Sequence, residues 1–202
     1  MGELNIGRLR FKRAFDINAL TDFNCGVKAL DDFIHDRKKG LEKLISLRLS
    51  NLWIVFNDLE DSSEVIGFFA LSKDALILNN MDLKNLRTES KEEDDEEQFW
   101  DQEKYSAIEI DYIAIQEKYR NHHIGSDIIN LIADRAANDP LSATLFLTVE
   151  ALDTKEYSAV PFYRQCNFLP SELAKNKQIY NQIHQGIMPT TQRMYKLILP
   201  LQ

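Results

Sequence analysis

Residues 112–132 read "YIAIQEKYRNHHIGSDIINLI" and join an apolar strand pattern to a helical pattern through a short polar loop. The strand prediction covers residues 107–115, and the helix prediction covers residues 124–138. At a helix N-terminus, the first backbone N–H groups lack intrahelical acceptors and lie at the positive end of the helix dipole. A loop that leads from a strand into such a helix can bind an anion, and glycine, here Gly125, permits the closest approach. The segment therefore predicts a phosphate-binding loop.

Two other kinds of site are excluded by residue spacing. The chain contains no GxxxxGK sequence, and the loop lacks the three glycines of a dinucleotide-binding fingerprint. His122 and His123 are adjacent, so their side chains diverge, and no HExxH sequence follows them. We therefore expect no metal ion at this loop.

The rest of the chain predicts strands and helices in alternation. Further strands are expected at residues 8–14, 52–57, 65–72, 143–152 and 192–199, with 74–80 extending the sheet. Further helices are expected at residues 27–39, where Gly40 would end the helix, at 41–49 and at 157–166. The helix at 124–138 turns these apolar residues towards a core: Ile128, Ile129, Ile132 and Ala136. Interleaved helices and strands predict an α/β (α+β) fold in which helices cover both faces of a sheet.

Size and composition predict a single domain over residues 1–202. The chain has 202 residues, of which 44% are apolar, which is enough for one packed core. No apolar run approaches the roughly 18 residues that a membrane helix needs, and the start has no signal-peptide pattern. The two cysteines, Cys25 and Cys166, are too few for a disulfide framework. We therefore expect a cytoplasmic protein with reduced thiols and no membrane association.

The charge of the chain is concentrated in one segment. Residues 89–103 hold nine acidic residues and one lysine, and this segment alone accounts for the net charge of −8. The other 23 basic and 23 acidic residues balance. Like charges at this density repel one another, so we expect a flexible acidic insertion at about 88–104. The alternative is a docking patch for a cation or a basic partner.

The central segment resembles motif A of the GNAT superfamily, the acetyl-CoA-dependent N-acetyltransferases, whose pattern is Gln/Arg-x-x-Gly-x-Gly/Ala. Arg120 matches the first position and Gly125 the last, whereas His123 replaces the middle glycine. We expect His123 to be tolerated if its φ is negative and its side chain points away from the ligand. The resemblance implies a mixed, mostly antiparallel sheet with a splayed strand pair that binds acetyl-CoA. The ligand-binding residues that it implies are Ile113, Ala114 and Ile115 for the pantetheine arm, and Arg120, Asn121, His122, His123, Ile124, Gly125 and Ser126 for the pyrophosphate.

A second segment, "SAVPFYRQCNF" at residues 158–168, resembles the family's "xA-x-x-FY-x-x-x-GF". Asn167 stands where glycine is usual, and asparagine is the non-glycine residue that best tolerates a positive φ. The resemblance implies that Tyr163 is the general acid that protonates the departing thiolate of coenzyme A. The alternative is that Phe162 and Tyr163 are core aromatic residues on a short helix.

The reaction also requires removal of a proton from the amine. Glu109 and Asp111 alternate on the predicted strand, opposite Ile108 and Ile110, and either could accept that proton through water. The alternative is that these carboxylates belong to a solvated or ion-paired strand face, with solvent as the base.

The stretch "FNCGVKALDDFI" at residues 23–34 is similar to the opening of one GNAT branch, which includes toxins that acetylate aminoacyl-tRNA. That branch implies an antitoxin partner, and many family members form homodimers through their last strands. The charge balance opposes a tRNA substrate, although residues 37–48 are locally basic. The first hypothesis is therefore an N-acetyltransferase that acts on a primary amine of a small molecule, peptide or protein. The alternatives are a toxin-type enzyme for aminoacyl-tRNA and a non-catalytic module that binds coenzyme A or a partner.

Overall fold

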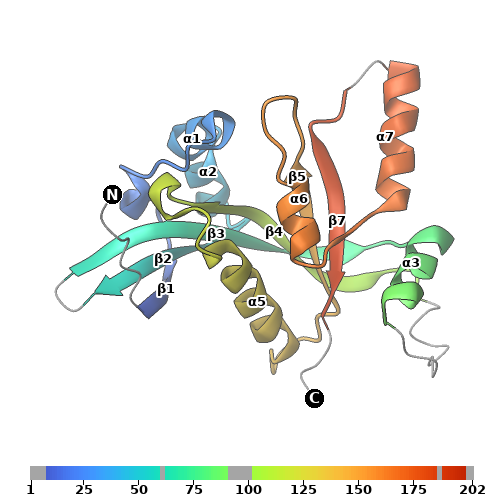
Figure 1. Ribbon diagram of the computed structural model, residues 1–202, viewed down its shortest axis with the longest axis horizontal. Helices are drawn as coiled ribbons and strands as arrows, with labels where there is room; N and C mark the ends of the chain where they lie inside the picture. The colour runs from blue at the N-terminus through green and yellow to red at the C-terminus, as the bar shows by residue number, and fades with distance from the viewer. Residues whose placement is uncertain (1–7, 60–61, 91–101, 186–187, 199–202) are drawn as a thin grey trace. The chain divides into compact units, whose positions relative to one another are not determined.

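The computed structural model describes residues 8–59, 62–90, 102–185 and 188–198, and its strands form a seven-stranded sheet in the order β1-β2-β3-β4-β5-β7-β6 (Figure 1). The strands are β1 (Arg8–Ala14), β2 (Asn51–Leu59), β3 (Ser62–Leu76), β4 (Tyr105–Ile115), β5 (Phe146–Leu152), β6 (Leu169–Pro170) and β7 (Thr191–Leu197). The α-helices are α1 (Lys28–His35), α2 (Leu41–Ser46), α3 (Asn80–Ser90), α5 (Ile124–Ala137), α6 (Val160–Gln165) and α7 (Glu172–Gln185), and the 3-10 helices are η1 (Asn18–Leu20) and η2 (Glu117–Tyr119). Most of the predicted acidic insertion, residues 91–101, lies outside the described residues.

The sheet confirms the mixed, mostly antiparallel architecture. Strand β2 pairs antiparallel with β1 and with β3, and β7 pairs antiparallel with β5 and with β6. The neighbours β4 and β5 are joined through α5, which is the kind of crossover that a parallel pair requires.

The chain forms two compact units. Unit 1 comprises residues 1–72 and 110–131, and unit 2 comprises residues 73–109 and 132–202. Strands β3 and β4 and helix α5 each contribute residues to both units.

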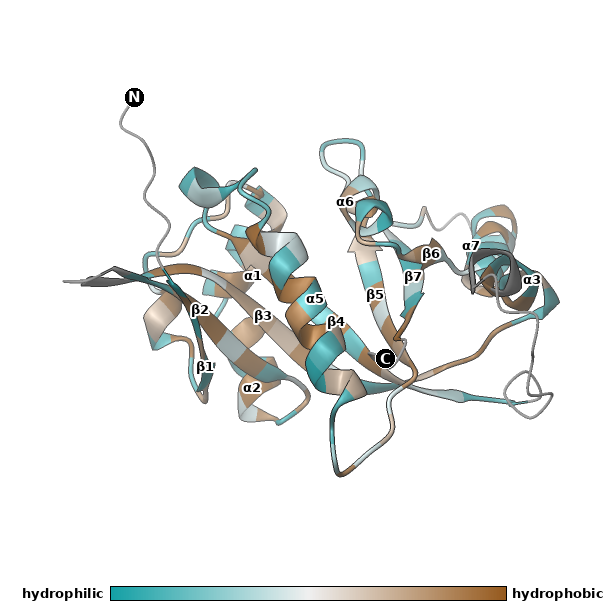
Figure 2. Cartoon of the chain, turned by 60° about the horizontal axis from the view of Figure 1, so that its bottom comes forward, coloured by the Kyte–Doolittle hydropathy of each residue, from teal (hydrophilic) through white to brown (hydrophobic). Residues whose placement is uncertain are grey.

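Unit 1 contains a sheet that carries helices on both faces. Figure 1 shows α1 and α2 on one face of these strands and the start of α5 on the other. The ring of Phe33 from α1 stacks on Tyr112 of β4 with centroids 4.5 Å apart, and Phe23 meets Phe68 edge to face at 5.4 Å. On the other side, Ile128 and Ile129 are fully buried, as the helical pattern predicts. Figure 2 shows the apolar and polar residues that alternate along α5.

Helix α1 is shorter than the pattern predicts, because Asp36 ends it. Asp36 is extended, with φ −75° and ψ 100°, and its carboxylate accepts the backbone N–H groups of Lys38 and Lys39 at 2.8 and 3.1 Å. These bonds offer the backbone an alternative to the helix and hold the pKa of Asp36 below its ordinary value. The predicted end at Gly40 is therefore wrong. Gly40 instead allows a close approach, since a Cβ there would lie 2.0 Å from the carbonyl oxygen of Phe33.

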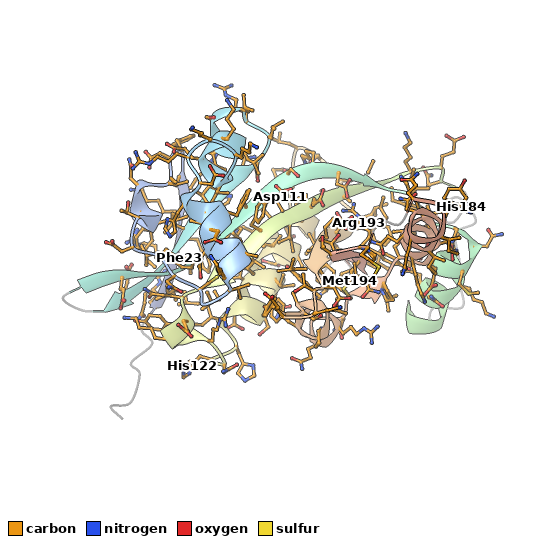
Figure 3. The ribbon with its side chains drawn as sticks, turned by 90° about the horizontal axis from the view of Figure 1, so that it is seen from above. Phe23, Asp111, His122, His184, Arg193 and Met194 are labelled. Carbon is orange, nitrogen blue, oxygen red and sulfur yellow. The ribbon has the colours of Figure 1, made fainter. Side chains whose placement is uncertain are left out.

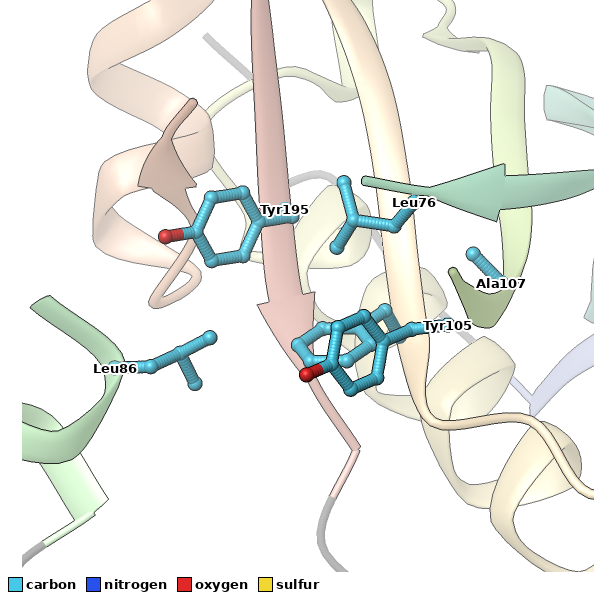
Figure 4. Packing of buried hydrophobic residues seen from close by; sticks show 6 residues of the cluster. Leu76, Leu86, Tyr105, Ala107 and Tyr195 are labelled. Carbon is cyan, nitrogen blue, oxygen red and sulfur yellow. The ribbon is translucent and has the colours of Figure 1, made fainter. Parts of the chain in front are cut away.

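Unit 2 is organised around buried aromatic residues (Figure 4). The ring of Phe146 meets Tyr105 and Tyr195 edge to face, with centroids 5.4 and 6.1 Å away. Leu76, Leu86 and Ala107 complete this buried cluster. Its members come from β3, α3, β4, β5 and β7, so the cluster joins segments that are far apart in the sequence.

Two helices of unit 2, α3 and α7, were not predicted. Strand β3 extends to Leu76, but residues 77–80 do not continue the sheet as expected, because Asn79 and Asp82 form a reciprocal cap for α3. The Asn79 side chain accepts the Asp82 N–H at 2.9 Å, and the Asp82 carboxylate accepts the Asn79 N–H at 3.2 Å. The same fully buried carboxylate accepts the N–H groups of Glu172 at 2.6 Å and Leu173 at 3.2 Å, so it also caps α7.

Candidate functional site

The predicted loop links η2 to α5 through two residues in the left-handed region. Arg120 is extended, Asn121 has φ +64° and His123 has φ +60°. The carbonyl oxygen of His123 then accepts the backbone N–H of Asp127 at 3.0 Å and the hydroxyl of Ser126 at 2.6 Å. This geometry turns the chain sharply and starts the helix at Ile124.

The backbone N–H groups of residues 121–126 are available to a ligand. Among the described residues, none accepts a hydrogen bond from these groups. Asn121, His122 and His123 are exposed, and Figure 3 marks His122 at the surface. Successive free N–H groups at the positive end of a 14-residue helix form a binding site for an anion such as a pyrophosphate.

The conformation of His123 differs from the one expected. A negative φ was the condition for a histidine at this position, but the structure gives φ +60°. This is the conformation that glycine adopts freely, and it costs an L-residue about 1–2 kcal/mol. The loop therefore keeps the backbone shape of the glycine motif although the middle glycine has been replaced.

We expect His123→Gly to leave the affinity for acetyl-CoA unchanged or to tighten it. The substitution removes backbone strain at φ +60°, so the free energy of unfolding should not fall by more than about 1 kcal/mol. Isothermal titration calorimetry and thermal unfolding would measure the two quantities. A clear loss of affinity would contradict this expectation and assign the imidazole itself to binding.

The segment before the loop is attached firmly to the β2–β3 hairpin. The hydroxyl of buried Tyr119 donates to Glu64 at 2.6 Å, and Lys118 forms an ion pair with the same carboxylate at 2.5 Å. These bonds to Lys118 and Tyr119 hold the pKa of Glu64 below its ordinary value. Burial, together with the bond to Glu64, raises the pKa of Tyr119. The backbone N–H of Gln116 donates to the Ile66 carbonyl at 2.8 Å, which joins η2 to β3.

The strand residues expected to bind the pantetheine arm lie directly before η2. Ala114 is buried, and Ile113 and Ile115 are half-buried. On the β3 side the strands approach closely, because a Cβ on Gly67 would lie 2.7 Å from the Ala114 carbonyl oxygen. The side-chain oxygen of Gln116 is buried and, within the described part of the chain, has no hydrogen-bond partner.

Tyr163 lies on α6 and is buried. The helix ends in a Schellman motif, in which the N–H groups of Phe168 and Asn167 donate to the carbonyls of Tyr163 and Arg164, both at 3.0 Å. Asn167 has φ +64°, which confirms the positive φ predicted for this position. The Tyr163 ring packs edge to face on Phe162 and Phe168, with centroids 5.1 and 5.3 Å away. Burial raises the pKa of Tyr163, so the hydroxyl keeps its proton at neutral pH.

Glu109 belongs to an ion network in unit 2. Arg193 from β7, labelled in Figure 3, donates to Glu109 at 2.7 Å and to Asp74 of β3. The same guanidinium lies 3.6 Å from Glu150 of β5, and the Thr148 hydroxyl donates to Asp74 at 2.6 Å. Arg193 is 15% exposed, so solvent screens this network only in part. Glu109 is therefore ion-paired with Arg193.

Asp111 occupies a different setting in unit 1 (Figure 3). The hydroxyl of Ser72 donates to one of its carboxylate oxygens at 2.8 Å, and the hydroxyl of Ser50 donates to the other. Ser50 itself is buried. Hydroxyl donors on both oxygens stabilise the ionised carboxylate.

The candidate residues divide between the two units. Unit 1 brings together the loop at 120–126, the strand residues Ile113–Ile115 and Asp111, whereas Tyr163 and Glu109 belong to unit 2. No local motif marks Arg193, Ser50 or Ser72, because each reaches its partner from a distant segment. Within the described ranges, no group of three histidine, cysteine or acidic residues could hold a metal ion. No helix among the described residues is both long and apolar enough to cross a membrane.

Comparison with known proteins identifies related folds. Residues 30–168 match the model of the Acetyltransferase (GNAT) family. A search of curated protein sequences finds no match to the chain. Among solved structures, a tyrosine-to-phenylalanine mutant of KacT is similar with a TM-score of 0.63 and 13% identity, covering 94% of this chain and 95% of that one.

Two further structures are similar in fold. AtaTR bound with acetyl-CoA has a TM-score of 0.61 and 16% identity, with 94% of each chain covered. AtaT complexed with acetyl-methionyl-tRNAfMet has a TM-score of 0.57 and 18% identity, covering 81% of this chain and 88% of that one. At these identities the likeness establishes the fold alone.

Proposed function

Because the chain belongs to the acetyltransferase (GNAT) family, we propose that it transfers the acetyl group of acetyl-CoA to a primary amine of a small molecule, peptide or protein. The observation that carries this proposal is the set of free backbone N–H groups at residues 121–126, at the N-terminus of α5. Arg120 adds a permanent positive charge beside them. A pyrophosphate fits this donor set, and the backbone of residues 113–115 is the proposed partner of the pantetheine amides. We also propose that both units form one acetyltransferase domain, because the family match takes in parts of each unit. The proposed location of this domain is the cytoplasm.

In the proposed reaction, the amine nitrogen attacks the thioester carbonyl and the carbon–sulfur bond breaks. The departing thiolate takes the phenolic proton of Tyr163, and the amine loses a proton through water to a carboxylate or to solvent. Tyr163 is buried, and burial raises its pKa, so the phenol is protonated before the reaction and has a proton to give to the thiolate. Glu109 is the proposed base, and its contact with Arg193 favours the ionised form that a base requires.

We expect Glu109→Gln to lower kcat by less than about tenfold, well below the effect of removing a general acid. The contact with Arg193 that favours ionisation also makes Glu109 a weak proton acceptor, so water can replace it at modest cost. Initial rates across pH would measure this difference. Asp111→Asn is the matched variant, because it removes the other candidate carboxylate on β4. A fall of several hundredfold for Glu109→Gln alone would show that the side chain is an indispensable base.

The proposed function is tested in two steps. Calorimetry with acetyl-CoA measures cofactor affinity, and radiolabelled acetyl-CoA then measures turnover with small amines, peptides and proteins. Saturable binding and labelled product would support the proposal. Binding without transfer to any amine would favour a non-catalytic module, and absence of binding would reject both.

A second candidate acceptor is the amino group of an aminoacyl-tRNA. It is favoured by the similarity in fold to AtaT, a structure of which contains acetyl-methionyl-tRNAfMet. The bases at residues 37–48 are all exposed and offer a surface for phosphates: Arg37, Lys38, Lys39, Lys43 and Arg48. Against it stands the charge balance, which is neutral outside one acidic segment. This candidate also implies a protein antitoxin, since AtaT is bound by the C-terminus of AtaR in another similar structure.

Acetylation of charged tRNA can be distinguished from the first proposal in one assay. Transfer to aminoacyl-tRNA should weaken steeply with salt, because phosphate contacts release counterions, whereas transfer to a neutral peptide should not. Uncharged tRNA is the control that lacks the amine. Growth arrest on expression, relieved by Tyr163→Phe, would support the tRNA substrate. Size-exclusion chromatography would test the proposed homodimer.

A further inference from the structure

The turn at residues 23–27, "FNCGV", belongs to the segment that is similar to one family branch, and none of the residues proposed for binding or catalysis lies in it. We call it the Cys25 turn. Gly26 has φ +73°, and its N–H donates to the Asn24 side chain at 2.7 Å. The N–H of buried Cys25 donates to Asp31 of α1 at 2.8 Å. The turn is therefore held by hydrogen bonds, one of which joins it to α1.

The same turn contacts η2, the segment that leads into the phosphate-binding loop. The backbone N–H of Glu117 donates to the Asn24 carbonyl at 3.1 Å. The Glu117 side chain also covers Gly26, since a Cβ on Gly26 would lie 2.9 Å from its Cδ. Burial raises the pKa of the Cys25 thiol to about 11, and its interaction with Asp31 adds to that rise.

Among the described residues, two segments hold η2, and the Cys25 turn is one of them. The other is the β2–β3 hairpin, which holds Tyr119 and Lys118 through Glu64. Four residues separate η2 from α5, and two of them, Asn121 and His123, have a positive φ. A loop in this uncommon conformation keeps its shape only if the chain at both ends is fixed. A binding loop that is already ordered also loses less conformational entropy when the ligand binds.

We propose that the Cys25 turn is a positioning element for acetyl-CoA, which sets the affinity by holding Glu117 and thereby the loop at 120–126. Gly26 is the residue on which this depends. A β-branched side chain there cannot adopt φ +73° without strain and would move the turn away from Glu117. The inference rests on the proposed function, because it assumes that the loop binds acetyl-CoA. It assigns no chemical step to the turn, so the turn should change binding and leave catalysis at saturation intact.

The test is the Gly26→Val variant of the full chain, assayed with acetyl-CoA. We expect the KM and the Kd for acetyl-CoA to rise about tenfold, while kcat at saturating acetyl-CoA stays near the wild-type value. Gly26→Asn should recover most of the affinity, because asparagine tolerates a positive φ better than other side chains. If Gly26→Val does not fold, Gly26→Ala provides the same test with less backbone strain.

Two controls separate positioning from general destabilisation. Leu52→Ala removes a fully buried side chain of β2 outside the turn, and should lower the melting temperature without raising the KM for acetyl-CoA. Lys28→Ala removes an exposed ion pair next to the turn and should change neither quantity. An unchanged KM for acetyl-CoA in folded Gly26→Val would overturn the inference, and so would an equal rise in this KM for Leu52→Ala. In both cases, binding of acetyl-CoA by the wild-type protein would still support the proposed function. Wild-type protein that does not bind acetyl-CoA would overturn the proposed function first.

Discussion

Tyr163→Phe is expected to lower kcat by about 10²- to 10³-fold and to leave the KM for acetyl-CoA close to the wild-type value. The phenolic hydroxyl is the proposed proton donor to the thiolate, and phenylalanine keeps the ring that packs on Phe162 and Phe168. The fold should therefore persist, with the Schellman motif after α6 intact, since that motif uses only backbone atoms. Steady-state rates at saturating acetyl-CoA and a thermal unfolding curve would measure the two effects.

Tyr180→Phe is the matched control for this substitution. Tyr180 lies on α7, is 58% exposed and has its ring against His184, away from any proposed role. Removal of its hydroxyl should leave kcat unchanged. If Tyr163→Phe retained the wild-type kcat, the general-acid assignment would be wrong and Tyr163 would be a core aromatic residue.

Gly125→Val is expected to weaken acetyl-CoA binding by about tenfold or more, with little change in the melting temperature. Gly125 lies in the first turn of α5 and, unlike Gly26, does not have a positive φ, so valine can adopt its backbone conformation. The branched side chain would instead stand among the free N–H groups and hold the pyrophosphate away from them. Calorimetric titration with acetyl-CoA would give the change in Kd.

The matched control for Gly125→Val is Asn130→Val. Asn130 is an exposed residue of the same helix, so this variant introduces the same β-branched residue without approaching the loop. Its affinity for acetyl-CoA should equal that of the wild type. Unchanged affinity in Gly125→Val would mean that the pyrophosphate does not bind at this end of α5.

The sequence predicts the central strand, loop and helix well because their signals are local. The apolar period of residues 107–115, the polar loop and the helical period of 124–138 each lie within one segment, and the structure places β4 and α5 there. Asn167 is similar, since the side-chain preference that predicts its positive φ belongs to that residue alone. His123 shows the limit of this reasoning. Its positive φ follows from the turn that the loop must make, which the identity of this one residue does not determine.

The features that the sequence did not predict depend on residues that are distant from one another. Helix α7 has no buried residue, and its N-terminus is capped by Asp82, which lies 90 positions before Glu172. Glu109 was recognised as a candidate base, but its partner Arg193 comes from the last strand, 84 positions later. Periodicity and local motifs carry no information about such pairs, because they form only when the whole sheet has assembled.

The double role of Asp82 links the opening of two helices that are far apart in the chain. Its carboxylate caps both α3 and α7, and its carbonyl accepts the Tyr195 hydroxyl at 3.2 Å. Opening of either helix would remove some of the donors to this buried carboxylate and weaken the cap of the other helix, so both should open together. Their amide protons should then exchange with solvent as one cooperative group, whose protection is lost in a single step. Asp82 would thus define a folding subunit within the larger protein.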